Sequence, residues 1–343
     1  MQNIKFGLFL PTGDFPQALA AAKWADENGL YSVSINDHFF SPFGSGQVPQ
    51  LECYSTLSAI AAVTSKVRLA PAVTAMSFRS PAMLAKITST LDQISHGRLI
   101  LGLGSGWQRS EYDAHGYPYP SNVERLDQLA DGIKLIKAMW TEDEPTYHGR
   151  YFSIEKAYNH PRPVQKPHPP IMVGGSGKRL LQIAGAEAQI ANLIPPIING
   201  KDFVQDPAAA VKFDKADVKR RIAMLQGFAK DAGRAPDAIE ISGIVLLSIA
   251  RDKSAADAAI KTTATGMGFV SEESARNSPV LLMGTPDEVR RELRSRIEDF
   301  GMTYYIVFPT SEESRDLLVR RSCRSSSRTK RRIANSDNQC FRA

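Results

Sequence analysis

The chain has 343 residues and a formal net charge of +6, and 43% of its residues are apolar. That apolar content is enough to bury a large core, and the length suits either two medium domains or one large α/β barrel. The apolar runs are too short to span a bilayer, so we expect a cytoplasmic protein that does not act at a membrane. The three cysteines lack metal-ligand spacing, and their odd number argues against a disulfide framework.

The positive charge is concentrated at the C-terminal end. Residues 320–343 contain eight basic residues and one acidic residue, a net charge of +7, which leaves −1 for the rest of the chain. A neutral body, and a basic tail without interleaved aromatic residues, argue against a nucleic-acid partner. Alternating serine and arginine cannot bury a face, so we expect residues 1–319 to form one folded domain and residues 320–343 a disordered or frame-shifted tail.

Eight short apolar runs are predicted to be β-strands because each is bounded by turn residues or by helical patterns. Helical stretches fill the intervals between them. Eight strand–helix units predict a (β/α)8 TIM barrel with insertions rather than two separate domains. The predicted strands cover residues 4–10, 31–35, 67–74, 99–104, 171–174, 189–193, 239–249 and 303–308.

Two helices have clear start signals. Ser121 and Glu124 form a predicted capping box. The helix that it opens has a predicted apolar stripe at Val123, Leu126, Ile133, Ile136 and Met139. In the second helix Thr285 is the predicted cap, Glu288 its reciprocal partner and Gly301 the stop. The main predicted insertions are a loop over residues 105–120 and a hairpin with a proline-rich segment over residues 145–170.

Candidate functional residues gather where the predicted strands end, which is where the active sites of such barrels lie. The second strand ends in Asp37 and His38, and the third ends at Thr74. A histidine that titrates near neutrality beside a carboxylate suits proton transfer. The alternatives are an Asx-turn or helix cap for Asp37 and a partly buried, hydrogen-bonded imidazole for His38.

Two glycine-rich turns lie on the same rim. The turn GLGSGW fails the dinucleotide-binding fingerprint because Trp107 occupies its sixth position and no helix is predicted before Asn122. The turn GGSG (residues 174–177) precedes a helix, so its N–H groups suit a phosphate. Each alone is explained equally well as a tight turn, but two such turns on one rim favour an extended phosphorylated cofactor.

Further residues are candidates for contact with a ligand. Trp107, Glu111 and Tyr158 are candidates for facing the substrate, although a solvated loop and loop packing are the alternatives for Glu111 and Tyr158. Lys178 and Arg179 follow GGSG and would give an anionic cofactor tail a cationic exit, or they are ordinary solvated helix residues.

The segments SINDHFF, RSPAMLAK through GLGSGW, PPIMVGGSGKRLLQIAG and LLMGTPDEV resemble the bacterial luciferase-like monooxygenase superfamily. The resemblance is specifically to its coenzyme F420-dependent oxidoreductase branch, and it covers residues 4 to about 318. It implies a barrel that holds a flavin or deazaflavin at the strand C-termini, often in a homodimer. Relatives that oxidise sugar phosphates have an acidic residue where Trp107 stands here, so the resemblance does not assign that substrate.

Carried over by position, the resemblance assigns the cofactor-binding residues. It implies a cis peptide bond at Ala72–Val73 under the cofactor ring. The assigned residues are Asp37, His38, Ala72 and Thr74 near the ring, Gly104 and Ser105 beside the chain, and Gly174, Gly175, Ser176 and Gly177 at the phosphate.

On this basis we expect an oxidoreductase that moves a hydride between F420 and a small organic substrate. His38 would handle the substrate proton, and Asp37 would orient His38 or contact the ring. An FMN-dependent monooxygenase of the same fold is the closest alternative. A non-catalytic cofactor-binding protein is a further one.

Overall fold

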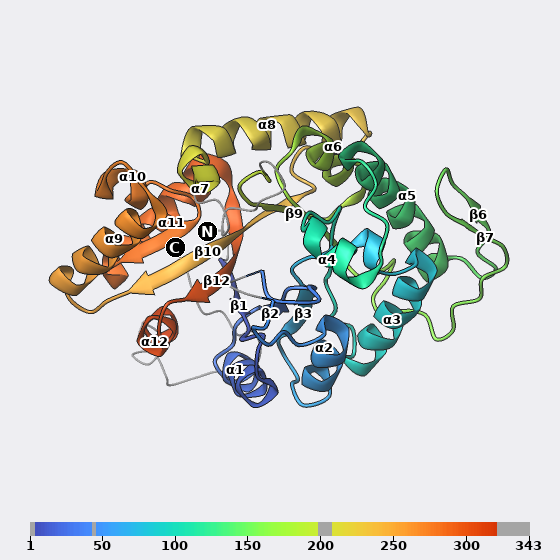
Figure 1. The fold of residues 1–343 in the computed structure, drawn as a ribbon, viewed down its shortest axis with the longest axis horizontal. Coiled ribbons are helices and arrows are strands. Elements are labelled where there is room, and N and C mark those ends of the chain that lie inside the picture. The colour runs from blue at the N-terminus through green and yellow to red at the C-terminus, as the bar shows by residue number, and fades with distance from the viewer. Residues whose placement is uncertain (1–3, 43–45, 198–207, 321–343) are drawn as a thin grey trace, which may run out of the picture.

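The computed structural model describes residues 4–42, 46–197 and 208–320. Within them, eight parallel strand positions follow one another in chain order around a nearly closed barrel (Figure 1). The third position is split into β3 and β4, which pair with β2 and β5 respectively, so the sheet meets itself at this strand. The positions are β1 (Lys5–Phe9), β2 (Ser32–Ile35), β3 (Arg68–Pro71) with β4 (Thr74–Ala75), β5 (Leu101–Gly104), β8 (Ile171–Gly174), β9 (Ile190–Leu193), β10 (Glu240–Ile249) and β12 (Met302–Pro309). The predicted (β/α)8 barrel is confirmed.

One further parallel strand, β11 (Leu281–Gly284), was not predicted. Because β10 has ten residues, its first half pairs with β9 and its second half pairs with β11. The second half of β10 therefore continues past the end of β9, with β12 on one side and β11 on the other (Figure 1).

Helices surround the barrel, and two predicted insertions contain additional structure. The strands β6 (Tyr147–His148) and β7 (Ser153–Ile154) form the predicted hairpin. None of the described helices is both long and apolar enough to cross a membrane. The helices are α1 (Phe15–Glu27), α2 (Cys53–Ala61), the 3-10 turn η1 (Met76–Phe78), α3 (Pro81–Ile94), α4 (Arg109–His115), α5 (Asn122–Thr141), α6 (Lys178–Glu187), α7 (Ala208–Lys212), α8 (Lys215–Asp231), α9 (Lys253–Met267), α10 (Glu272–Arg276), α11 (Pro286–Phe300) and α12 (Glu312–Arg320).

Helix α4 corrects the prediction that no helix follows GLGSGW before Asn122. It has only seven residues and ends at Gly116, whose φ of 71° favours glycine. Such a short polar helix cannot show a repeating apolar stripe, so its pattern resembles a loop. Its buried residues, Glu111 and Tyr112, face the barrel.

The predicted helix ends are confirmed in α11, where Thr285 and Glu288 form a full capping box and Gly301 has a φ of 64°. At the start of α5 the Ser121 hydroxyl accepts a hydrogen bond from the Glu124 N–H. Val123, which the apolar stripe of α5 was expected to bury, is 69% exposed.

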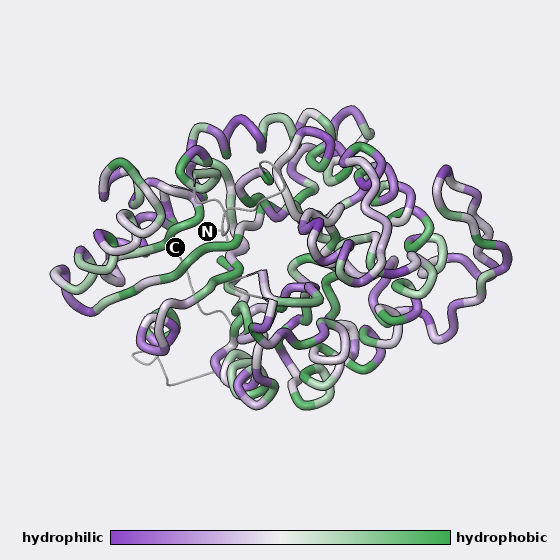
Figure 2. The backbone as a smooth tube through the Cα atoms, in the orientation of Figure 1, coloured by the Kyte–Doolittle hydropathy of each residue, from purple (hydrophilic) through white to green (hydrophobic). Residues whose placement is uncertain are grey.

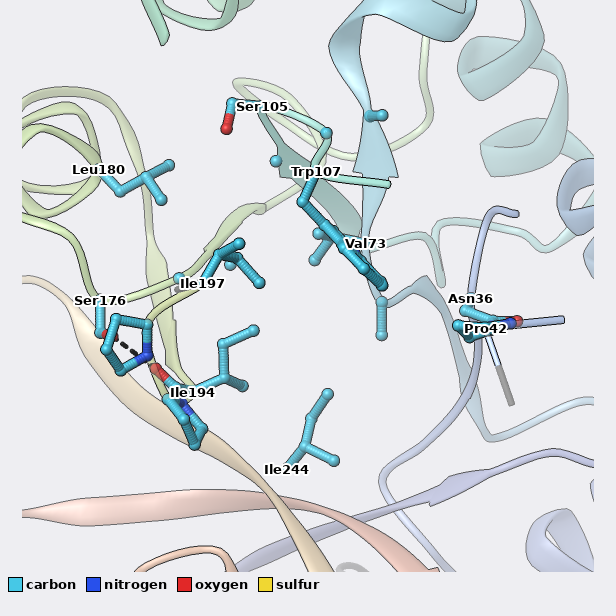
Figure 3. A pocket seen from close by; sticks show the side chains of 18 of the residues that line it. Asn36, Pro42, Val73, Ser105, Trp107, Ser176, Leu180, Ile194, Ile197 and Ile244 are labelled. Carbon is cyan, nitrogen blue, oxygen red and sulfur yellow. Dashed lines mark hydrogen bonds between the residues drawn. The ribbon is translucent and has the colours of Figure 1, made fainter. Parts of the chain in front are cut away.

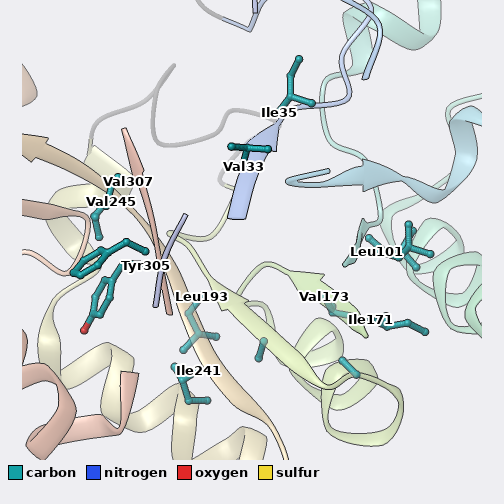
Figure 4. Close-up of a cluster of buried hydrophobic side chains, with 14 of the residues drawn as sticks. Val33, Ile35, Leu101, Ile171, Val173, Leu193, Ile241, Val245, Tyr305 and Val307 are labelled. Atoms are coloured by element: carbon teal, nitrogen blue, oxygen red, sulfur yellow. The ribbon is translucent and has the colours of Figure 1, made fainter. Parts of the chain in front are cut away.

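The core has an inner and an outer layer. Side chains alternate along the strands, so Tyr304 and Ile306 fill the barrel interior together with Phe9 and Met172, whereas Tyr305 packs outward. Figure 4 shows part of the outer layer, and Figure 2 shows the apolar strands in green within more polar helices. Because the interior is filled, the space for a ligand lies at the ends of the strands.

The predicted domain ends at residue 319, next to Arg320, the last residue that the structure describes. Helix α12 ends at Arg320. The predicted tail, residues 320–343, lies outside the described residues from 321 onward. Its predicted disorder therefore stays a prediction.

Candidate functional site

A cavity of about 890 Å³ lies at the C-terminal ends of the barrel strands (Figure 3). The glycine turns 104–106 and 174–177, which follow β5 and β8, both line it. So do predicted site residues from four strand ends: Asp37, His38, Ala72, Gly104, Ser105, Trp107, Glu111, Gly174, Gly175, Ser176 and Gly177.

Val73 forms the floor of the cavity together with two glycines (Figure 3). The Ala72–Val73 peptide bond is cis, as the resemblance implied. A Cβ atom added at Gly104 or at Gly174 would lie 2.8 Å from a Val73 methyl carbon. Only glycine lets the valine lie against both strand ends. The result is a smooth apolar floor that suits one face of a flat ring.

His38 is held by a buried carboxylate from α4. Its Nδ1 lies 2.7 Å from Oε2 of Glu111, whose side chain is fully buried. The other oxygen, Oε1, accepts from the Phe39 N–H at 2.6 Å. Because this carboxylate accepts hydrogen bonds on both oxygens, the His38 ring donates through Nδ1, and Nε2 is the nitrogen left for a ligand. Trp107 packs edge-on against the imidazole at 5.7 Å.

Asp37 does not bond His38 among the described contacts. It forms a two-pronged ion pair with Arg79, at 2.6 and 3.1 Å, and Arg79 also reaches Glu52. Burial would lower the pKa of Arg79, but the charge and hydrogen bonds of Asp37, together with Tyr54 and Glu52, raise it. The ion pair anchors the end of β2 to the segment before α3. The carboxylate that orients His38 is Glu111.

Two predicted site residues lie outside the cavity lining. Thr74 is fully buried and bonds the Tyr54 hydroxyl at 2.8 Å, because side chains alternate along the strand and its neighbours Val73 and Ala75 take the cavity side. Tyr158 is 58% exposed and donates to Oε1 of Glu144, so loop packing, the alternative interpretation, describes it better.

The turn at 174–177 offers backbone donors to an anion. The Gly175 N–H is used by the Asn192 carbonyl, and the Ser176 hydroxyl donates to the Ile194 carbonyl at 2.5 Å (Figure 3). Gly177 caps α6 without a side-chain hydrogen bond. Among the described contacts, the N–H groups of Ser176 and Gly177 have no protein acceptor. They therefore remain for a phosphate at the start of the helix.

Three cations line the same end of the cavity: Arg125, Lys178 and Arg179. Arg179 pairs with Asp127 at 2.9 Å and is 48% exposed. Arg125 was not among the predicted residues, because an arginine in a helical stripe is usually a solvated one. Arg79 was also missed, since nothing in the sequence pairs it with Asp37.

The opposite wall is apolar. Its side chains come from the middle of β10, the start of β11, the end of β12 and the end of α9, and they include Ile244, Leu246, Met267, Leu281 and Phe308. None of these residues was predicted from the sequence to line the site. Strand residues of this kind give no signal that separates a cavity wall from a core.

The sequence profile of the luciferase-like monooxygenase family matches residues 4–197, more than half of the chain. The chain belongs to this family. The floor and the 174–177 turn fit a flavin or a deazaflavin, because they combine a flat apolar surface with N–H donors at a helix start that have no acceptor among the described residues.

Relatives with both kinds of cofactor are similar to this chain. A 5,10-methylenetetrahydromethanopterin reductase of Methanopyrus kandleri is 30% identical over 84% of this chain and 74% of its own length. The solved structure of the coenzyme F420-dependent tetrahydromethanopterin reductase from this organism aligns with a TM-score of 0.72 over 93% of this chain and 98% of that one, at 21% identity. An FMNH(2)-dependent dimethylsulfone monooxygenase of Pseudomonas putida is 33% identical over 48% of this chain and 44% of its own length.

An uncharacterized protein of Mycobacterium tuberculosis is 34% identical over 50% of this chain. This alignment spans 65% of the mycobacterial protein. Similarity to these relatives thus establishes the family and the fold. The choice between F420 and FMN depends on the site.

Proposed function

We propose that the protein is an F420-dependent oxidoreductase that transfers a hydride between the deazaflavin and a small organic substrate. The observation that carries the proposal is the cationic, exposed end of the cavity. There the N–H groups of Ser176 and Gly177, which have no acceptor among the described residues, are followed by Lys178 and Arg179, which line the cavity and also reach the surface. F420 extends beyond its phosphate as a long anionic tail, whereas FMN ends at its phosphate, so only F420 needs such an exit.

When bound, the cofactor supplies or accepts the hydride. In the proposed reaction the protein itself transfers the proton of the substrate, and His38 is the residue that would accept or donate this proton. The bond from Nδ1 to Glu111 at 2.7 Å fixes the ring and leaves Nε2 to bind a substrate hydroxyl or carbonyl oxygen. Nε2 takes the proton when an alcohol is oxidised and donates it when a carbonyl is reduced.

The apolar wall would exclude water from this reaction. Ile244, Leu246 and Phe308 line the cavity without offering a hydrogen-bonding side chain. Exclusion of water from the cofactor ring would strengthen the hydrogen bonds to His38. It would also prevent loss of the hydride to solvent.

The second candidate function is an FMN-dependent monooxygenase, favoured by the Pseudomonas putida relative. It would use the same floor and the same phosphate turn but would consume oxygen. Titration of the purified protein with F420 and with FMN, followed by absorbance, tests the choice. We expect tighter binding of F420 and turnover without oxygen uptake. Tighter FMN binding with oxygen-dependent turnover would replace our proposal with the monooxygenase.

The role of the exit can be tested separately. Replacing both Lys178 and Arg179 by alanine should weaken F420 far more than FMN, since only the tail of F420 passes these residues. Arg150→Ala is the matched control, because Arg150 also pairs with Asp127 but does not line the cavity. Equal losses of affinity for both cofactors in the double variant would show that Lys178 and Arg179 do not form an exit for the F420 tail.

A further inference from the structure

Asn36 is a buried amide that the reaction described above does not use. It directly follows β2, is only 6% exposed and lines the cavity. Figure 3 shows Asn36 and Ser176 on opposite sides of the cavity, with Val73 between them. Asn36 therefore lies at the end of the cavity that is far from the 174–177 turn.

The orientation of the Asn36 amide is fixed by Gln50. The NH2 group of Gln50 donates to the Leu51 carbonyl at 3.1 Å and to Oδ1 of Asn36 at 3.0 Å. A backbone carbonyl can only accept, so the contact with Leu51 identifies the nitrogen of the Gln50 amide. Asn36 must then present its oxygen to Gln50, and its own NH2 group points elsewhere.

The NH2 group of Asn36 has no acceptor among the described residues. Its polar neighbours are already bonded, because Asp37 holds Arg79 and the Glu111 carboxylate holds His38. Buried polar groups are normally hydrogen-bonded, since an unpaired donor loses its hydration without compensation. The NH2 group is therefore a donor that remains for a ligand in the cavity.

Two other described asparagines are at least nine-tenths buried, and both use their NH2 groups. Asn159 donates to the Ser89 hydroxyl at 2.8 Å and to the Met139 carbonyl at 3.0 Å. Asn192 donates to the Ser242 hydroxyl at 3.0 Å. Neither residue lines the cavity. The unused donor is thus found on the buried asparagine that does line it.

The surroundings of Asn36 suit an oxygen on an otherwise apolar molecule. His38 lies two residues further along the chain and also lines the cavity, with Nε2 left for a ligand. Phe9, on the neighbouring strand β1, and Phe308 line the cavity too, and their ring centroids are 5.3 Å apart. Binding sites for small molecules commonly combine such apolar walls with a few polar groups that fix the orientation of the ligand.

We propose that Asn36 binds the substrate, its NH2 group donating a hydrogen bond to the oxygen whose proton His38 exchanges. The inference deepens the proposed function and rests on it. In alcohol oxidation the O–H proton passes to Nε2 of His38, the hydride passes from carbon to the deazaflavin, and the electrons of the O–H bond form the C=O bond. In ketone reduction the carbonyl oxygen accepts from both side chains. Negative charge develops on this oxygen during hydride transfer, so a fixed donor there stabilises the transition state.

The test is steady-state reduction of acetone, cyclohexanone and acetophenone by the protein with reduced F420. Asn36→Leu removes the donor without adding a charge, and Asn36→Asp removes it but keeps an acceptor for Gln50. Both variants should lower kcat/KM for the best ketone on the order of 10²-fold, mostly through kcat. The F420 dissociation constant should change by less than about 3-fold.

An inhibitor without the oxygen separates contact with the substrate from support of the fold. Methylenecyclohexane has the shape of cyclohexanone, but the CH2 group in place of the oxygen cannot accept a hydrogen bond. Its inhibition constant should not rise by more than about 3-fold in Asn36→Leu. Asn277→Leu, at an exposed asparagine outside the cavity, is the control and should leave kcat/KM unchanged.

The outcomes distinguish the inference from the proposed function. A kcat/KM unchanged within about 3-fold in both variants would overturn the inference and leave the function standing. A matching loss of affinity for F420 or for methylenecyclohexane would show that Asn36 supports the cofactor or the fold, and would also overturn the inference. A wild-type protein that binds F420 but reduces none of the three ketones would overturn the inference while the choice of cofactor stands. If it does not bind F420, both proposals fail.

Discussion

The two halves of the cavity wall differ in chemistry. Every charged or hydrogen-bonding side chain that lines the cavity among the described residues lies between Asn36 and Arg179, in the first half of the barrel. From Ile194 onward, the described lining residues are aliphatic, aromatic, proline or glycine. The family profile ends at residue 197, close to the same division.

This difference separates two tasks. The first half places donors, cations and a histidine at the ends of β2, β5 and β8, where a cofactor's polar groups need them. In the proposed function, the second half would supply shape and exclude water, as a substrate pocket for a small organic molecule needs. Changes in the first half should therefore affect cofactor binding and the chemical step, and changes in the second should affect the choice of substrate.

The largest effect is expected at His38. Replacing His38 by glutamine keeps a polar side chain at the end of β2 but removes the group that exchanges a proton. We expect kcat to fall about 10²- to 10⁴-fold, the usual contribution of a general acid or base. The measurement is steady-state turnover with a substrate found by screening alcohols and ketones against the F420 absorbance. An F420 dissociation constant unchanged within about 3-fold would show that the variant keeps an intact cofactor site. An unchanged kcat would show that His38 takes no part in proton transfer.

A smaller loss of kcat is expected on replacing Glu111, because this residue would act by orienting His38. Glu111→Gln leaves an amide that can still bond the ring but no longer favours a donor at Nδ1, so the imidazole can adopt either tautomer. We expect kcat to fall about 10- to 100-fold, with KM little changed. The ¹⁵N NMR spectrum of the His38 ring should show a protonated Nδ1 in the wild-type protein and a mixture of tautomers in the variant. Identical spectra would mean that Glu111 only supports the fold.

The sequence predicted the barrel well because alternation of short apolar strands with capped helices is a local signal. All eight predicted strands correspond to barrel positions, and the cap and stop of α11 lie at the predicted residues. The misses were short elements. The helix α4 contains too few residues to show a period, so nothing separates it from a turn. The strand β11 is no shorter than β8, which was predicted, so its length does not explain the miss.

The site was predictable only where a motif marks a strand end. Asp37 and His38 stand together in the sequence, but which carboxylate orients His38 depends on α4 folding back from residue 111. The burial of Arg125 likewise follows from the rotation of α5, which exposes Val123 and turns the arginine inward. Composition and spacing therefore predict an element but do not give the direction of each side chain within it.

A test of the apolar wall uses Ile244, whose side chain lies in the cavity opposite Trp107 (Figure 3). Ile244→Ala should change the ratio of kcat/KM values between a small and a larger substrate about 10-fold, because each methylene group in such a pocket contributes about 1–3 kcal/mol. The F420 dissociation constant should not change. A loss of cofactor affinity as large as the loss of kcat/KM would contradict the separation of the two halves.

The smallest effect concerns stability, and it lies in the second half of the barrel. Burial would raise the pKa of Glu288, but hydrogen bonds from Lys253 and from the Thr285 cap lower it from 4.5 to about 2. Because the folded-state pKa is the lower one, this carboxylate stabilises the fold fully above about pH 4.5, and the contribution is lost as the pH falls toward 2.

Glu288→Gln keeps the capping hydrogen bond but removes the charge. We expect a loss of about 1 kcal/mol or less in the free energy of unfolding at pH 7, because the ion pair with Lys253 is partly exposed. Urea titrations between pH 7 and pH 3 should show this difference shrinking as the pH falls below 4.5. Glu298→Gln, at an exposed carboxylate of the same helix with no ion pair among the described contacts, is the control. A gap between wild type and Glu288→Gln that is independent of pH would mean that the capping geometry, and not the charge, holds the start of α11, since only ionisation of the carboxylate makes the difference depend on pH.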